Sequence, residues 1–183
     1  MLRSLFGEGM MVRYLSVLAA LAVAVPANAE VEVGDNGFAT SNSATVSATP
    51  DEVWAALIEP SRYWNGDHSW SGDAANFSLE PVAGGCFCEI WGEGNSVEHM
   101  RVVMVQPGSI LRLAGALGPL QSEGLAGALT WQLEAVDGGT RITQTMSVGG
   151  HMQFDRESFP PVVDSVVRQQ LDGLVALFPG NQD

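Results

Sequence analysis

The chain lacks lysine entirely, and its eight basic residues, all arginine, stand against 21 aspartate and glutamate residues. The formal net charge at pH 7 is −13. A surface of this charge repels phosphate backbones and anionic lipid head groups, which argues against nucleic-acid binding and against electrostatic attachment to a membrane. The composition therefore favours neutral or cationic partners.

Several signatures of catalysis are also missing. The sequence contains no serine-centred hydrolase elbow, no phosphate-binding loop, no dinucleotide fingerprint and no HExxH zinc motif. Nucleophilic catalysis therefore has little support, and we expect no cofactor. The sequence also lacks internal repeats and low-complexity tracts, which favours a single ordinary domain at this length.

Residues 1–29 have the composition of a secretory signal peptide. Two arginines precede an apolar run over residues 14–25, and residues 27–29, Ala-Asn-Ala, match a small-residue cleavage site. The run of about 12 residues is shorter than the roughly 20 that a membrane-spanning helix needs. We expect cleavage before Glu30, a periplasmic or secreted mature protein, and no membrane attachment after cleavage.

The segment after the signal predicts a lead-in followed by one domain. Residues 30–42 are small and polar, which predicts a flexible lead-in, and residues 43–180 are expected to form the domain. Alternating and β-branched residues over 38–48 predict the first strand. Thr49 and Glu52 then flank a proline in the pattern of a capping box, which predicts a short helix.

Period-two patterns separated by glycine-rich turns predict an antiparallel sheet in the middle of the chain. The expected strands span residues 77–80, 86–91, 97–105, 110–115, 128–136 and 141–148. The last two strands have one apolar face, formed by Leu129, Trp131, Leu133, Ile142, Met146 and Val148. Gln144 falls on the same face and predicts an internal polar contact.

Residues 160–178 predict a long amphipathic helix that ends the chain. Apolar side chains recur at helical spacing on one side, and Leu171 lies in the middle of this stripe. One helix cannot bury such a stripe alone, so the apolar face of the sheet is expected to cover it. The pattern therefore predicts an α+β fold with a hollow or packed core between sheet and helix.

An aromatic loop over residues 62–73 lies between the short helix and the sheet. Tyr63, Trp64, His68 and Trp70 occur there without a regular period, which predicts an ordered loop rather than a helix or strand. Two interpretations stand: a lid over a pocket, or a plug that closes one end of the core.

The order of these elements resembles the helix-grip fold of the SRPBCC superfamily. This superfamily includes START lipid-transfer domains, pathogenesis-related allergens, polyketide cyclases and bacterial homologues of the activator of Hsp90 ATPase. The likeness rests on residues 48–57 (ATPDEVWAAL), 81–85 (PVAGG), 103–108 (VMVQPG) and 138–142 (GGTRI). It implies a curved antiparallel sheet wrapped around the C-terminal helix, with a hydrophobic cavity between them, but no single activity.

Cysteine is scarce, and its two occurrences, Cys86 and Cys88, fall in one predicted strand. On a strand the two side chains share a face with alpha carbons about 6.6 Å apart, near the limit for a disulfide. We therefore expect free thiols, which is unusual for an exported protein. A metal site would also need His68 or His99, and we expect no metal because buried thiols require no ligand role.

Glu89, His99 and Arg101 are a candidate polar cluster on neighbouring strands. Val103 and Val105 predict that His99 and Arg101 point inward, since the four share one strand phase. One hairpin register places Glu89 opposite His99, so that all three side chains line the cavity. The other places Cys88 opposite His99 and turns Glu89 to the other face. The sequence leaves both registers open.

Two functions of different class follow from these features. The first is a carrier that binds a small hydrophobic molecule between sheet and helix. The second is a cyclase-like or dehydratase-like enzyme that uses Glu89 and His99 as acid and base. Trp131 is expected to report binding by its fluorescence, and a closed core is the rival outcome. The expected ligand-binding residues are Trp64, His68, Trp70, His99, Arg101, Trp131, Gln144, Met146 and Leu171.

Overall fold

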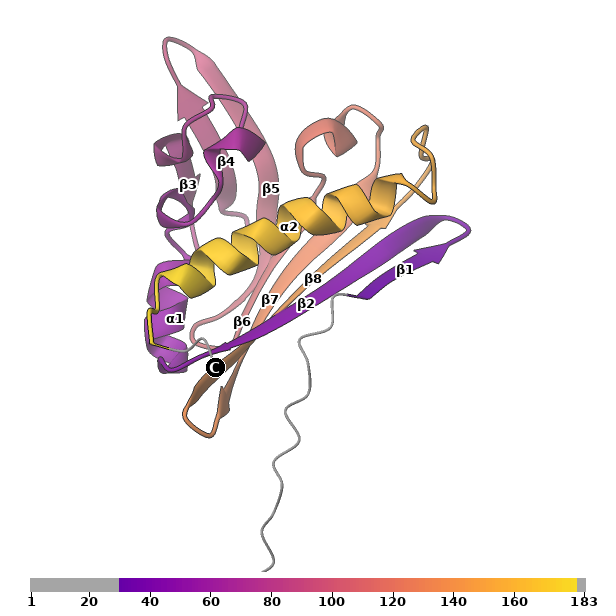
Figure 1. Cartoon of the computed structure of the whole chain (residues 1–183). Coiled ribbons are helices and arrows are strands. Elements are labelled where there is room, and N and C mark those ends of the chain that lie inside the picture. The colour runs from indigo at the N-terminus through magenta and orange to yellow at the C-terminus, as the bar shows by residue number, and fades with distance from the viewer. Residues whose placement is uncertain (1–29, 181–183) are drawn as a thin grey trace, which may run out of the picture.

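A computed structural model describes residues 30–180, so the predicted signal peptide lies outside the described part of the chain. One eight-stranded antiparallel sheet, in the order β1-β2-β8-β7-β6-β5-β4-β3, carries the long helix α2 across one face (Figure 1). The predicted α+β helix-grip arrangement is confirmed. The strands are β1 (Glu30–Gly34), β2 (Gly37–Val46), β3 (Phe77–Leu79), β4 (Cys86–Trp91), β5 (Asn95–Gln106), β6 (Ile110–Gly115), β7 (Ala126–Val136) and β8 (Gly139–Gly149).

Within residues 30–180, two α-helices and four short 3₁₀ segments accompany the sheet. Helix α1 begins with the predicted capping box, in which the Thr49 N–H donates to the Glu52 carboxylate at 2.8 Å and the Glu52 N–H donates to the Thr49 hydroxyl at 3.3 Å. No helix in the described residues is both long and apolar enough to cross a membrane. The helical segments are α1 (Pro50–Leu57), η1 (Pro60–Arg62), η2 (Gly66–His68), η3 (Ala74–Asn76), η4 (Gly118–Gln121) and α2 (Phe159–Ala176).

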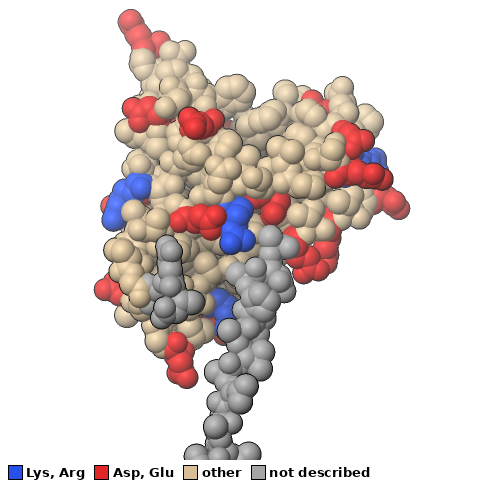
Figure 2. Space-filling model, viewed as in Figure 1, with Lys and Arg blue, Asp and Glu red and all other residues tan. Residues whose placement is uncertain are grey.

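The core lies between the sheet and α2. The predicted apolar face of β7 and β8 is confirmed, because all six of its side chains are buried. Helix α2 buries its predicted stripe against this face, including Leu171 and Leu174. Acidic side chains outnumber arginines on the face of the molecule in Figure 2, as the composition requires.

The expected flexible lead-in over residues 30–42 is wrong as a description of local structure. Strand β1 pairs with β2 in register from Glu30 opposite Ser41 to Gly34 opposite Gly37. The residues that resemble a mobile segment, Asp35 and Asn36, form the two-residue turn of this hairpin, a position that favours such residues. A Cβ at Gly37 would collide with the Val148 carbonyl oxygen, so glycine there permits close packing of β2 on β8.

Four alternate residues of β5, from His99 to Val105, were predicted to point inward. The prediction is right for the first and the last of them and wrong for the two between. His99 is buried and Val105 packs against the core, but Arg101 is exposed and Val103 is 49% exposed. Pairing shifts by one residue at two places, beside Phe87 on β4 and between Val102 and Met104 on β5. Each shift reverses the side-chain alternation, so the second restores the phase that the first inverts.

The expected free thiols are also wrong, because Cys86 and Cys88 form a disulfide. Their alpha carbons lie 5.4 Å apart, closer than the spacing of a regular strand and within the range of disulfides. Phe87 and Glu89 point into the core, so the disulfide lies on the opposite face of β4.

Candidate functional site

A cavity of about 390 Å³ lies beside the N-terminal half of α2. Its walls come from the aromatic loop, from the turn around η4, from α2 and from one residue of β5. Most of the wall is apolar, and none of the described arginines lines it. The lining residues are Trp64, Asp67, His68, Ser69, Trp70, His99, Leu117, Gly118, Pro119, Leu120, Phe159, Val162, Val163, Val166 and Val167.

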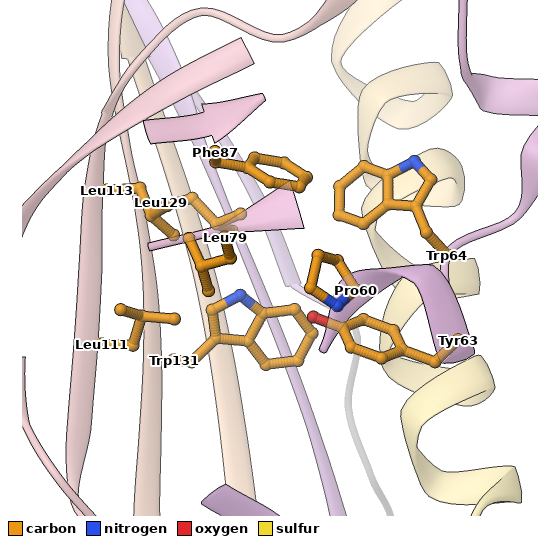
Figure 3. A pocket seen from close by; sticks show the side chains of 9 residues that line it. All are labelled: Pro60, Tyr63, Trp64, Leu79, Phe87, Leu111, Leu113, Leu129 and Trp131. Atoms are coloured by element: carbon orange, nitrogen blue, oxygen red, sulfur yellow. The ribbon is translucent and has the colours of Figure 1, made fainter. Parts of the chain in front are cut away.

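The core around Trp131 is packed, in contrast to this cavity. Figure 3 shows leucines and Trp131 of the sheet facing Tyr63 and Trp64 of the aromatic loop, around a void of only about 10 Å³. The rings of Tyr63 and Trp131 meet edge to face at 6.3 Å, and the Tyr63 hydroxyl donates to the Leu57 carbonyl at 3.0 Å. The void holds no more than about one water molecule.

The predicted ligand-binding residues do not share one site. Trp64, His68, Trp70 and His99 line the 390 Å³ cavity, whereas Trp131 borders the small void, which Trp64 also reaches. Gln144, Met146 and Leu171 are buried outside the walls of both spaces, and Arg101 is exposed beside Glu98. The predicted internal contact of Gln144 is not formed, because neither its amide nitrogen nor its amide oxygen has a partner among the described residues.

One wall of the cavity, made by the turn between β6 and β7, was not predicted from the sequence. This connection contains Leu117, Pro119 and Leu120 in a segment that has neither strand nor helix periodicity. Its length and its several apolar side chains are the signal that could have indicated it, because an exposed turn has no need of leucine. Gln121 in the same turn donates to the carbonyl oxygens of Glu98 at 2.7 Å and His99 at 3.3 Å.

Glu89 and His99 meet in the core, although neither predicted register occurs. Glu89 pairs with Val97 across the hairpin, while His99 is the additional residue of the irregular pairing and has no direct partner on β4. His99 lies two residues from Val97 and therefore on the same face of β5, and its Nε2 is 3.0 Å from Glu89 Oε2. Gln121 holds the backbone of β5 at this point, so the irregularity is part of the site.

The Glu89 carboxylate also holds the aromatic loop. It is completely buried and accepts the backbone N–H groups of Trp70 at 3.1 Å and Ser71 at 2.6 Å. The loop thereby combines both predicted roles. Trp64 is buried as a plug in contact with Phe77 and Phe87, whereas Trp70 is 56% exposed at the edge of the cavity.

The environment makes Glu89 ionised and His99 neutral near pH 7. Burial raises the pKa of Glu89, but hydrogen bonds from Ser71, Trp70 and His99 outweigh it, so this pKa lies below its ordinary value. Burial lowers the pKa of His99 and Glu89 offsets only part of that effect. An ionised carboxylate can only accept hydrogen bonds, so the His99 proton must lie on Nε2.

The remaining ring nitrogen of His99, Nδ1, is a hydrogen-bond acceptor, and His99 is one of the residues that line the cavity. Nδ1 has no partner among the described residues, and it is not one of the fully enclosed polar atoms. Phe77 and Phe87 hold the ring, with centroids 4.9 and 5.3 Å from that of His99. Such an imidazole accepts a hydrogen bond from a ligand or takes a proton from it, with Glu89 as its positioning residue.

The described residues contain no group of three or more histidine, cysteine or acidic side chains placed to hold a metal ion. His68 donates to or accepts from Gln169 across 3.2 Å at the surface and does not join Glu89 and His99. The chemistry of the site therefore rests on one carboxylate–imidazole pair at the edge of an apolar cavity.

An antiparallel sheet that packs on one long C-terminal helix defines the helix-grip class of folds. The chain belongs to the polyketide cyclase/dehydrase and lipid transport family, whose model matches residues 38–179. This confirms the predicted SRPBCC membership. No match was found among curated proteins.

Solved structures with a similar fold come from several bacteria. CalU16 from Micromonospora echinospora is 17% identical, with a TM-score of 0.56 over 87% of this chain and 88% of that one. An uncharacterised protein from Rhizobium leguminosarum is 19% identical, with a TM-score of 0.56 over 82% and 97% of the two chains. Mll3558 from Rhizobium loti is 23% identical, with a TM-score of 0.53 over 75% and 94%. At these identities the likeness shows the fold alone.

The Glu89–His99 pair predicts a loss of stability in acid. Because the pKa of His99 is below 6.5 in the folded protein, its contribution is complete above pH 6.5 and is lost as the pH falls through the lowered value. Glu89 adds a loss of the same sign below pH 4.5. Urea unfolding over about pH 4 to 8 should show the free energy of unfolding decreasing from pH 6.5 downward.

The variant His99→Phe should flatten this decrease between pH 6.5 and 4.5, because the buried ring no longer takes up a proton. His151→Gln, which changes an exposed histidine outside the cavity, is the matched control. Parallel profiles for wild type and His99→Phe would contradict the assignment of His99 as a buried neutral imidazole.

Proposed function

We propose that this protein binds a small, largely apolar molecule in the cavity beside the N-terminal half of α2. The observation that carries the proposal is the cavity itself, whose volume of about 390 Å³ lies in the range of small-molecule sites. Its wall combines many apolar side chains with a few polar groups, as is typical of such sites. Membership of a cyclase and lipid-transport family supports the same conclusion.

The charge of the site favours a neutral or cationic ligand over an anion. Asp67 lines the cavity, no described arginine does, and the whole chain carries a formal charge of −13. An anionic ligand would therefore lose its hydration without gaining a charged partner, which is costly in an apolar site.

Binding should change the fluorescence of Trp70 rather than that of Trp131. Trp70 is 56% exposed at the cavity edge and loses water contact when a ligand enters, whereas Trp131 is 2% exposed in the packed core. Titration with naphthalene should shift the tryptophan emission to shorter wavelength, and Trp70→Phe should remove most of that shift. Trp91→Phe, on β4 outside the cavity wall, is the control and should retain it. An equal loss in both variants, or none in either, would contradict a site at this cavity.

A second candidate function is catalysis by the Glu89–His99 pair. This function is favoured because His99 lines the cavity and its Nδ1 has no partner among the described residues, while Glu89 holds the other ring nitrogen, Nε2. In a cyclase-like or dehydratase-like reaction His99 would remove a proton from the substrate, and Glu89 would stabilise the imidazolium that forms. The carrier proposal needs no such proton transfer.

The two functions differ in what the ligand becomes. Molecules extracted from wild-type protein and from His99→Gln protein, both purified from the native host, are compared by mass spectrometry and chromatography. A carrier returns the same molecule from both, in lower yield from the variant. An enzyme returns product from wild type and accumulated substrate from the variant, separated by one water in a dehydration or by retention time in a cyclisation. Identical molecules would eliminate catalysis by His99.

We also propose that the protein is exported after removal of residues 1–29, and that Glu30 begins the mature chain. The apolar run and the Ala-Asn-Ala site support this, and so does the Cys86–Cys88 disulfide, since disulfides persist in oxidising compartments. The intact mass of protein from the periplasm or medium should correspond to a chain that starts at Glu30 with its disulfide formed. Recovery of the full-length chain in the cytosol would overturn the proposal.

A further inference from the structure

We propose that the ligand carries a hydroxyl group, as an alcohol or a phenol, and that this group donates a hydrogen bond to His99 Nδ1. The inference rests on the proposed function, because it assumes that the cavity is the binding site. It adds which polar group of the ligand lies in the cavity and which atom of the protein forms a hydrogen bond with that group.

The first step is the protonation of the pair, which follows from geometry. Both oxygens of Glu89 already face N–H donors, with Ser71 on Oε1 and with Trp70 and His99 on Oε2. Three N–H donors converge on these two oxygens and stabilise the ionised carboxylate, which can only accept, so His99 Nε2 is the donor in this contact. Nδ1 of the neutral ring is then left with a lone pair only.

The second step is that His99 Nδ1 has no hydrogen-bond partner among the described residues. The aromatic rings that contact His99 are those of Phe77 and Phe87, which offer no hydrogen bond. A ligand that covers His99 without a donor leaves Nδ1 desolvated and unpaired, which is unfavourable. A ligand with a hydroxyl group at this position satisfies it.

The third step concerns the ligands that this arrangement rejects. A carboxylate or an ether oxygen would face the lone pair of Nδ1 with one of its own, and no described arginine lines the cavity to compensate a negative charge. The site therefore selects ligands that donate a hydrogen bond at this position over ligands that can only accept one. It favours neutral hydroxylated molecules over fatty-acid-like anions of similar size.

The test uses four probes of similar shape: naphthalene, 1-naphthol, 1-methoxynaphthalene and 1-naphthoate. Titration calorimetry at pH 7.5 to 8, about one unit above the ordinary pKa of histidine, should show 1-naphthol binding roughly three- to tenfold more tightly than 1-methoxynaphthalene. 1-Naphthoate should bind most weakly. In ¹⁵N-histidine NMR spectra of the wild type, Nδ1 of His99 should move when 1-naphthol is added and stay in place with 1-methoxynaphthalene.

The variant His99→Phe keeps an aromatic ring between Phe77 and Phe87 and should remove the preference for 1-naphthol while leaving naphthalene bound. His151 is exposed and lies outside the cavity wall, so the control variant His151→Gln should retain the preference for 1-naphthol. The NMR measurement needs no variant, so it decides the question even if His99→Phe does not fold. Equal affinities for 1-naphthol and 1-methoxynaphthalene, or tightest binding of 1-naphthoate, overturn hydroxyl recognition while the proposed function stands. Failure of all four probes to bind overturns the proposed function as well.

Discussion

The buried carboxylate of Glu89 is the interaction on which the site depends. A carboxylate without water is costly unless donors replace the lost hydration, and here three N–H groups from two separate segments do so. Trp70 and Ser71 thereby fix the aromatic loop, and His99 is fixed in one tautomer with Nδ1 at the cavity wall. One charged group thus sets the position of a wall segment and the hydrogen-bonding character of the pocket.

The pairing between β4 and β5 is irregular beside this contact. Val97 lies opposite Glu89, and His99, two residues further along β5, is the additional residue without a partner on β4. Gln121 holds the carbonyl oxygen of His99 from the turn beyond β6. Irregular pairings commonly re-aim a side chain beside a functional site.

Much of the fold was predictable because its signals are local. The capping box at Thr49, the alternation in β7 and β8, and the stripe of α2 each depend on residues close in sequence. The errors arose where a single residue changes the phase of a strand, as at His99, or where polar residues form a tight turn, as at Asp35. The outward direction of Arg101 was not predictable, because it follows from the irregular pairing, and the disulfide was not predictable because regular strand spacing places the two cysteines near the limit for such a bond.

The site was only partly predictable for a related reason. The apolar stripes indicated a space between sheet and helix, and Trp64, Trp70 and His99 line the cavity that the structure contains. The stripes did not show that Trp131 and Tyr63 fill one half of that space while the other half stays open, since complementarity of shape is not encoded in periodicity. The turn around Leu120 completes the open half.

Native mass spectrometry of wild type and Val166→Trp, both purified from the native host, tests most directly whether a ligand occupies the open half. Val166 lines the cavity, and the larger side chain of tryptophan at this position takes up space that a ligand would occupy. Our account predicts extra mass on the wild type that is absent from the variant, with both proteins giving the same circular dichroism spectrum. The same extra mass on both proteins, or none on the wild type even after addition of 1-naphthol, would contradict it.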